Sequence, residues 1–560
     1  MKYKILCEDK NLDLIERIFK IRGISDDIDN FLNPKIKNYR LDPLKLNDMQ
    51  KAVNRIIKAI EKNEKIMIFG DYDADWVTSS FILFKFFAKY LKYKNISIMY
   101  PDRIEDWYGL KNKHLDSIKE KWVDLIITVD NWITSVLEAE YAKEIWIDLI
   151  ITDHHKNWEQ IPDAIAVVNP VISKDYDFKY LAGVWVAFKL ICALLDQIWI
   201  FNGDDTLEEN WNKKNKIFNY FLPIVAIWTV ADIVPLIWEN RLLVKKWLDL
   251  INNNRHLISE SLQWFLKYLN LKEVDTFHIW FVIWPRINAG GRISSPYKSL
   301  DTLLFTWAKQ LKSLQEIDEI NTNRKKLQES AFKIAEESLN LEDKLLIAES
   351  EDFHEWIVGI VSWRITEKYN KPSIVFKINK EKWIAVASLR GPEYFDIIDM
   401  IQKHGNLLER SWWHKHAWWL TVKIEKLKDL KEKLIKYSNE IILEDDLEKT
   451  ILVDTHITHD EWNYDLMKLL QDLWPFGEWN KEPNFLFKDI LVDKVEKVWK
   501  NGNWHMKICG NFGDKKINFL FWWKWDMIKS VDKKSNIDIV WKIKKDDFNG
   551  WYFVNGVEII

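Results

Sequence analysis

Short apolar runs alternate with helical patterns over much of the first half of the chain. Residues 65–69, 123–129 and 148–152 are largely apolar and of strand length, whereas 47–62 repeats apolar side chains at helical spacing. Strands that alternate with helices are typical of a parallel sheet with crossover helices. We therefore predict an α/β domain over residues 46–299, preceded by an N-terminal segment, 1–45, that two prolines interrupt.

The second half of the chain divides into three parts. Residues 300–342 are charged, lack Pro and Gly, and carry Leu311, Leu314 and Ile317 at roughly helical spacing, which predicts a long connecting helix. Residues 343–428 repeat the strand and helix alternation and predict a second, smaller α/β domain. Residues 445–560 are dominated by β-type segments, which suit a small barrel of the OB type, a common binder of single strands.

Acidic residues follow the first strand at alternate positions. Asp71, Asp73 and Asp75 come directly after the apolar run 65–69. Alternate residues of an extended segment point the same way, so three carboxylates would gather on one side of the strand end. Such a group repels itself unless a cation neutralises it. A solvated acidic turn is the plainer explanation when this stretch is considered alone.

Three further hydrophobic stretches also end in acidic or imidazole side chains. They end in Asp130, in Asp153-His154-His155 and in Asp232. In open α/β sheets, ligands bind beyond the carboxyl ends of the strands. Mixed imidazole and carboxylate ligands suit Mn²⁺, while carboxylates alone suit Mg²⁺. Four such strand ends together favour a site for two divalent cations.

These motifs resemble those of a known family. Gly70-Asp71-Tyr72-Asp73-Ala74-Asp75, Asp130, Asp153-His154-His155 and Asp232 match the four motifs of the DHH phosphoesterases. The likeness extends through 101–103, 181–184, 285–292 and 475–478, and over nearly the whole chain it is similar to the RecJ family. The resemblance implies a parallel-sheet DHH domain, a DHH-associated domain and an OB-type barrel. It also implies a 5′→3′ exonuclease specific for single-stranded DNA, which releases 5′-mononucleotides in DNA repair and recombination.

The resemblance also implies roles for individual residues. The implied metal ligands are Asp73, Asp75, Asp130, His154 and Asp232, with Asp71 either a ligand or just outside the ligand shell. Asp130 is the expected bridge between the ions, His155 is expected to assist the substrate phosphate, and Asp153 is expected to orient a histidine. Arg103, Ser388 and Arg390 match positions around a terminal 5′-phosphate; Arg286, Asn288 and Arg292 match contacts near the scissile bond; His414 lies in a loop of the second domain.

Tryptophan stands where the family has glycine. The chain contains 33 Trp and 16 Gly, although a protein of this length usually contains roughly 39 glycines. We hypothesise that the gene uses UGA for glycine and that these codons are read here as Trp. TGA codons are expected at six positions in particular: Trp76, Trp132, Trp412, Trp413, Trp418 and Trp419. Glycines in such loops allow positive φ and close approach to a ligand, so indoles there would cause strain.

Composition restricts the setting and the partners. The net charge is −4, so nucleic-acid binding must come from a local groove. Cys7, Cys192 and Cys509 show no metal or redox spacing, and no signal peptide or membrane span is evident, which favours the cytoplasm. We expect a monomer that acts on single-stranded DNA. By family analogy, a single-strand-binding protein or a RecQ-type helicase is a possible partner.

Two alternatives belong to other functional classes. One is a DHH-family phosphodiesterase that acts on oligonucleotides or cyclic dinucleotides, and the other is a non-catalytic single-strand-binding replication scaffold. The β-rich region 445–560 favours a long polymeric substrate over the first. The complete set of matched ligands argues against the second.

Overall fold

The computed structural model describes residues 2–9, 11–24, 27–35, 41–70, 73–101, 110–131, 133–156, 160–198, 207–414, 417–500, 503–522, 524, 527–528, 531–545 and 552–559. The chain divides into two compact units. One consists of Lys4–Gly291, Ser295–Gln315 and Leu452–Ile560, and we call it the catalytic-barrel unit. The other consists of Met1–Tyr3, Arg292–Ser294 and Glu316–Ile451, and we call it the second unit.

A five-stranded parallel sheet forms the centre of the catalytic-barrel unit. Its strand order is β3-β2-β4-β5-β6. The strands are β2 (Ile66–Phe69), β3 (Ile96–Met99), β4 (Leu125–Val129), β5 (Asp148–Thr152) and β6 (Ala166–Val168). The central strands are apolar throughout because both faces of the sheet are covered, as is usual for parallel sheets.

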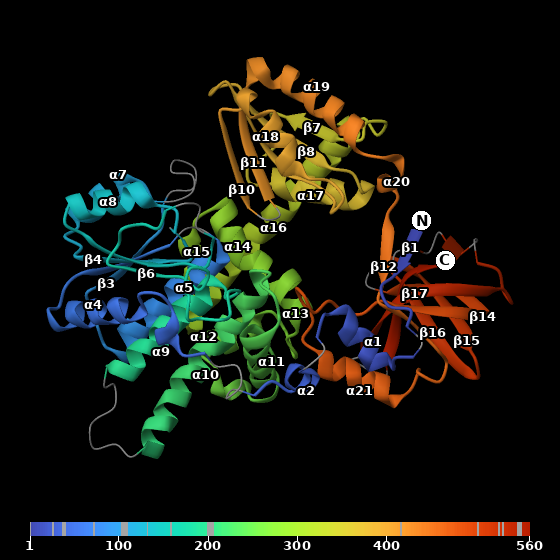
Figure 1. Cartoon of the computed structure of the whole chain (residues 1–560), viewed down its shortest axis with the longest axis horizontal. Helices are drawn as coiled ribbons and strands as arrows, with labels where there is room; N and C mark the ends of the chain where they lie inside the picture. Colours follow the sequence, from blue (N-terminus) through green and yellow to red (C-terminus); the bar gives the residue numbers. More distant parts are fainter. Residues whose placement is uncertain are drawn as a thin grey trace. The chain divides into compact units, whose positions relative to one another are not determined.

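Helices cover the two faces of this sheet (Figure 1). The helices α4 (Met49–Glu61), α5 (Ala74–Lys85) and α9 (Gly183–Gln197) lie on one face, and α7 (Asn112–Glu120) and α8 (Val136–Glu144) on the other. Crossover helices bring the carboxyl ends of β2, β4 and β5 to the same edge of the sheet. This edge carries the residues after each strand that the sequence marks as metal ligands.

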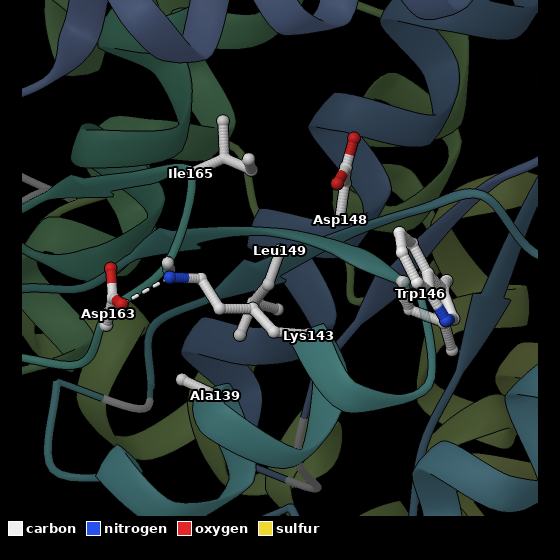
Figure 2. A pocket seen from close by; sticks show the side chains of 9 residues that line it. Ala139, Lys143, Trp146, Asp148, Leu149, Asp163 and Ile165 are labelled. Carbon is white, nitrogen blue, oxygen red and sulfur yellow. Dashed lines mark hydrogen bonds and ion pairs between the residues drawn. The ribbon is translucent and has the colours of Figure 1, made fainter.

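A cavity lies at the opposite end of the sheet. It encloses about 230 Å³ and is lined by Ala139, Lys143, Trp146, Ile147, Asp148, Leu149, Asp163, Ala164 and Ile165. Figure 2 shows Lys143 reaching Asp163, with which it forms an ion pair, and Asp148 forms another with Arg55. The cavity therefore lies at the beginning of β5 and its acidic groups already have cationic partners.

A helical layer packs beside the parallel sheet and its covering helices, and together they form what we call the catalytic part of the unit. It consists of α10 (Leu207–Ala231), α11 (Trp238–Asn253), α12 (Glu260–Tyr268), α14 (Trp284–Ile293) and α15 (Pro296–Leu304). The end of α10 is buried in the core, as its apolar sequence predicts. No helix within the described ranges combines the length and apolar character that a membrane span requires.

The C-terminal part is a β-barrel. Its strand order is β13-β14-β15-β16-β18-β17, and a further pairing of β14 with β17 closes the sheet on itself. The strands are β13 (Thr455–Ile457), β14 (Phe485–Lys500), β15 (Asn503–Phe512), β16 (Lys515–Phe521), β17 (Asn536–Lys545) and β18 (Tyr552–Ile559). The N-terminal helices α1 (Leu14–Ile21) and α2 (Ile28–Leu32) share its apolar core with α21 (Tyr464–Leu473).

The second unit contains a mixed five-stranded sheet of order β10-β11-β9-β8-β7. The strands are β7 (Leu346–Ser350), β8 (Ser373–Asn379), β9 (Ile384–Arg390), β10 (Arg410–His414) and β11 (Ala417–Lys423), packed with α17 (Val358–Tyr369), α18 (Ile397–Lys403) and α19 (Ile424–Ile441). The helix α16 (Trp307–Ser338) runs from the catalytic-barrel unit into the second unit. The predicted fold class, two α/β parts joined by a long helix and followed by a barrel, is confirmed.

Candidate metal centre

The amino end of α9 holds the carboxyl group of Asp75. Asp73 caps α5 by accepting hydrogen bonds from the N–H groups of Asp75 (3.0 Å) and Trp76 (3.2 Å), which places Asp75 in the first turn. Asp75 Oδ2 accepts from the N–H of Gly183 at 2.8 Å, and Oδ1 accepts from that of Val184 at 3.0 Å. These amides form the positive end of the helix dipole. The buried carboxylate is therefore fixed in orientation.

Asp130 reaches the same place from the end of β4. Its backbone is left-handed (φ 56°), a conformation that Asp adopts more readily than most residues. A Cβ atom at position 183 would lie only 2.4 Å from Asp130 Oδ1, so the missing side chain of Gly183 makes room for this carboxyl group. The first residue of α9 thus serves both aspartates.

His154 completes the cluster. Its Nδ1 lies 2.8 Å from the carbonyl oxygen of Leu181, so Nδ1–H donates and Nε2 carries the lone pair. Nε2 lies 2.9 Å from Asp130 Oδ1 and 3.7 Å from Asp232 Oδ2. Potential ligand atoms of Asp75, His154 and Asp232 all lie within 4.8 Å of one another, and so do those of Asp130, His154 and His155.

The charges in this cluster call for cations. Burial first, and then the neighbouring aspartates, raise the pKa of Asp75, of Asp130 and of Asp232 above the ordinary value of a carboxyl group. Asp130 Oδ1 and Asp232 Oδ2 are buried and accept no hydrogen bond from the described residues. Carboxylate oxygens and an imidazole nitrogen in this arrangement fit Mn²⁺ or Mg²⁺, which would neutralise the repulsion.

Asp153 orients His155 rather than joining the cluster. Its Oδ1 lies 2.7 Å from His155 Nδ1 and accepts the backbone N–H groups of His154 (2.6 Å) and His155 (3.0 Å). Oδ2 accepts the N–H of Ile133 at 2.9 Å. Although burial alone would raise the pKa of Asp153, the charge of His155 and these hydrogen bonds hold it at about 2. The charge and hydrogen bond of Asp153 in turn outweigh burial and raise the pKa of His155.

The other expected substrate contacts fall in several places. Arg286 and Asn288 lie on α14, where Arg286 donates to the Val282 carbonyl at 2.7 Å and Asn288 is nearly buried. Arg292 lies on the same helix but belongs to the second unit. There Ser388 and Arg390 lie together on β9. His414 is the last residue of strand β10 and does not lie in a loop as expected. Its side chain, like Asp71 and Arg103, lies outside the described residues.

Sequence reasoning assigned no role to several backbone groups of the site. The Leu181 carbonyl and the amides of Gly183 and Val184 fix two of the metal-type ligands. The residues 181–184 contribute to the family resemblance, but main-chain donors and acceptors leave no mark on side-chain identity. A glycine at the start of an apolar helix is the one available signal.

Comparisons with known proteins find similarity in two parts of the chain. The model of the DHH family, N-terminal domain, matches residues 65–218, and the model of the RecJ OB domain matches residues 453–554. Residues 65–218 are thus similar to the DHH family, and residues 453–554 are similar to the OB domain of RecJ.

Among the similar proteins is the single-stranded-DNA-specific exonuclease RecJ of Bacillus subtilis, 31% identical over 93% of this chain and 64% of that protein. RecJ of Haemophilus influenzae is 29% identical over 89% of this chain and 87% of its own length. The chain thus spans slightly less than two thirds of the first relative and most of the second. The crystal structure of Thermus thermophilus RecJ with Mn²⁺ has a TM-score of 0.78 at 22% identity, over 98% of this chain and 75% of that one, which shows the fold.

Removal of one carboxylate tests the candidate centre. In Asp130→Asn we expect a melting temperature equal to or above that of the wild type without metal, because one buried acidic group is removed. Mn²⁺ should stabilise the wild type by about 2.7 kcal/mol at a hundredfold excess over its Kd, and should not stabilise the variant. Thermal unfolding with and without Mn²⁺ measures both effects.

Asp352→Asn is the matched control, since Asp352 is exposed and lies in the second unit. It should retain the full response to Mn²⁺. An equal Mn²⁺ response in Asp130→Asn would show that this cluster is not the metal centre.

Proposed function

We propose that this chain is a metal-dependent exonuclease that degrades single-stranded DNA from the 5′ end and releases 5′-mononucleotides. The observation that carries the proposal is the cluster of Asp75, Asp130, His154 and Asp232 at the carboxyl edge of a DHH sheet. A RecJ OB domain in the same chain supports a long single-stranded substrate. Two relatives are named single-stranded-DNA-specific exonucleases.

The chain's own residues prepare the site for this reaction. Divalent ions bound there would supply a nucleophilic water at neutral pH and neutralise charge on the phosphate. Asp75, Asp130, His154 and Asp232 would hold these ions, together with Asp73, whose charge raises the pKa of the three other aspartates. Asp130 has two carboxylate oxygens and can contact both ions, whereas Nε2 of His154 has one lone pair. His155, held by Asp153 through Nδ1, carries its Nε2 on the opposite side of the ring, where it can donate to a phosphate oxygen.

Two side chains and a helix end in the second unit support action at a 5′-phosphate. Arg390 Nη1 donates to Ser388 Oγ at 3.1 Å and to the Leu389 carbonyl at 2.6 Å. A Cβ atom at Gly359, in the first turn of α17, would lie 3.1 Å from Ser388 Oγ and 3.4 Å from Arg390 Nη2. A guanidinium, a hydroxyl and the amino end of a helix are together suited to a phosphate group.

The proposed substrate has consequences for partners and location. An enzyme that acts on single strands depends on a partner that separates duplex DNA, such as a RecQ-type helicase, or on one that binds the separated strands, such as a single-strand-binding protein. With chromosomal DNA as its substrate, the protein would act in DNA repair and recombination and would be located in the cytoplasm.

Digestion of end-labelled DNA tests the reaction. With Mn²⁺ the wild type should release mononucleotides from the 5′ end of a single strand and spare blunt duplex and cyclic dinucleotides. Asp130→Ala should reduce hydrolysis by more than a hundredfold but leave single-strand binding in EDTA largely unchanged, because the barrel carries that binding. Products that begin at the 3′ end, or Asp130→Ala activity within tenfold of wild type, would contradict the proposal.

The phosphate site predicts a preference for phosphorylated ends. Arg390→Gln should lower the rate ratio of 5′-phosphate to 5′-hydroxyl substrates by about tenfold or more, since a hydrogen bond to a charged group contributes roughly 1.5–3 kcal/mol. The matched control is Arg364→Gln, because Arg364 also belongs to the second unit, on α17, but pairs with Glu329. An unchanged ratio in Arg390→Gln would exclude the guanidinium from this role.

We further propose that glycine occupies many of the Trp positions in the native protein. In the described part of the chain, six of the fifteen non-glycine residues with positive φ are Trp: Trp122, Trp146, Trp238, Trp307, Trp383 and Trp479. Each is more than half exposed. Trp122 and Trp146 directly follow the C-cap residues of α7 and α8, where a left-handed glycine usually ends a helix.

The expected strain does not apply to all the Trp residues named from the sequence. Trp76 lies in the first turn of α5, and Trp412, Trp413, Trp418 and Trp419 lie in the paired strands β10 and β11, so none of these has a left-handed backbone. Trp132 lies outside the described residues. The strain argument therefore rests on the six left-handed positions and not on those first named.

Replacing the six left-handed Trp residues with Gly should stabilise the protein. Relief of roughly 1–2 kcal/mol at each position amounts to about 6–12 kcal/mol, which is comparable with a typical stability of about 5–15 kcal/mol. Trp363→Gly is the control, since Trp363 is helical and exposed and glycine should be unfavourable there. A lower melting temperature of the sixfold variant, or TGG codons at these positions, would refute the proposal.

A further inference from the structure

The turn that follows Asp232 is held by the loop that connects α21 to β14 of the barrel. Asp232 comes directly after α10, and the turn 233–237 connects it to α11. Within this turn Ile233 has a left-handed backbone (φ 59°) and Leu236 is buried in the core of the catalytic part. The position of Asp232 therefore depends on what fixes this turn.

The loop 475–480 makes direct contact with the turn. The N–H of Leu236 donates to the Glu478 carbonyl at 2.9 Å. Gly477 lies against the side chain of Leu236, where a Cβ atom would be 2.5 Å from Cδ1. The loop itself is fixed by Asn480, which is fully buried and donates to the carbonyls of Leu473 (2.8 Å) and Pro475 (2.9 Å).

Asn240 extends this contact to the other ligands. Its side-chain amide donates to the Pro235 carbonyl, within the turn, at 3.1 Å, and to the carbonyl of Tyr180. Tyr180 immediately precedes Leu181, whose carbonyl accepts a hydrogen bond from His154. The amides of Gly183 and Val184, two and three residues after Leu181, donate to Asp75. Asn240 is fully buried on the first turns of α11.

We propose that the loop 475–480 and Asn240 form a positioning element for the metal centre. Docking of the barrel domain then sets the affinity of the metal centre for divalent cations. The loop fixes the turn after Asp232, and Asn240 ties this turn to the segment that orients His154 and Asp75. Residues of this kind contribute through the ligands they orient, and their loss typically lowers metal affinity by about 10–100-fold. The inference rests on the proposed function, since it takes these residues as metal ligands.

Gly477→Ala tests the element through Mn²⁺ binding, measured by calorimetry or by the EPR signal of unbound Mn²⁺. The added methyl group must displace the buried Leu236, and the Mn²⁺ Kd should rise by about tenfold or more. Leu236→Ala makes room for this methyl group, so the double variant should bind Mn²⁺ more tightly than Gly477→Ala alone. Asn240→Ala should weaken Mn²⁺ binding independently of the loop.

Gly510→Ala is the matched control. Gly510 lies on β15, and a Cβ atom there would approach Ile490 Cγ2 at 2.8 Å inside the barrel, far along the chain from the Asp232 turn. It should destabilise the barrel without changing the Mn²⁺ Kd. Equal Kd changes in Gly477→Ala and Gly510→Ala, or no change in Gly477→Ala and Asn240→Ala, would overturn the inference. A wild type that binds no Mn²⁺ would instead contradict the proposed function itself.

Discussion

Repulsion among the carboxylates at one edge of a parallel sheet is the constraint on which the catalytic part depends. Asp75 and Asp130 are buried, and Asp232 lies close enough for its charge to raise the pKa of both. Such groups stay together only because each is held separately. The amides of α9 bind Asp75, and the left-handed backbone after β4 directs Asp130 over Gly183. These contacts hold the carboxyl groups together despite their mutual repulsion, and a bound cation would reduce that repulsion.

The catalytic part and the barrel are joined by polar contacts as well as by the chain. Arg241, on α11, is almost fully buried and donates to carbonyls of Phe31, Asp472 and Pro475. Its guanidinium also lies over the Phe31 ring, 4.0 Å from the centroid. A buried charge that binds several carbonyls holds the N-terminal segment, the catalytic helices and the barrel in one arrangement. The barrel and the turn after Asp232 therefore share this support.

The backbone restricts residue choice independently of chemistry. Left-handed conformations after α7 and α8, and in the turn between β8 and β9, are positions where glycine is favoured, yet Trp122, Trp146 and Trp383 stand there. Their exposure means that no packing compensates for the strain. Trp541 is different, because it is fully buried, contacts Phe487 and Phe519, and has no positive φ. Backbone conformation and burial thus separate two kinds of Trp position in one chain.

Local patterns in the sequence were sufficient for the main elements and for most of the candidate ligands. Apolar runs predicted β2, β4 and β5, and the strands place Asp130 and His154 next to Asp75 because parallel strands end at a common edge. The long helix α16 also followed from periodicity, and the β-type segments of residues 445–560 predicted the barrel. The order of strands and candidate ligands along the chain is sufficient for this prediction, so no knowledge of distant contacts is needed.

Only the tertiary structure decided which main-chain groups complete the site. The Leu181 carbonyl, the Gly183 and Val184 amides and the Glu478 carbonyl come from segments far from their partners in sequence, and their chemistry is the same in every residue. The pairing of β10 with β11 and the left-handed Trp positions likewise could not be predicted from the sequence, since each depends on backbone direction. Side-chain identity shows which groups can bind a metal, whereas the fold determines which backbone groups orient them.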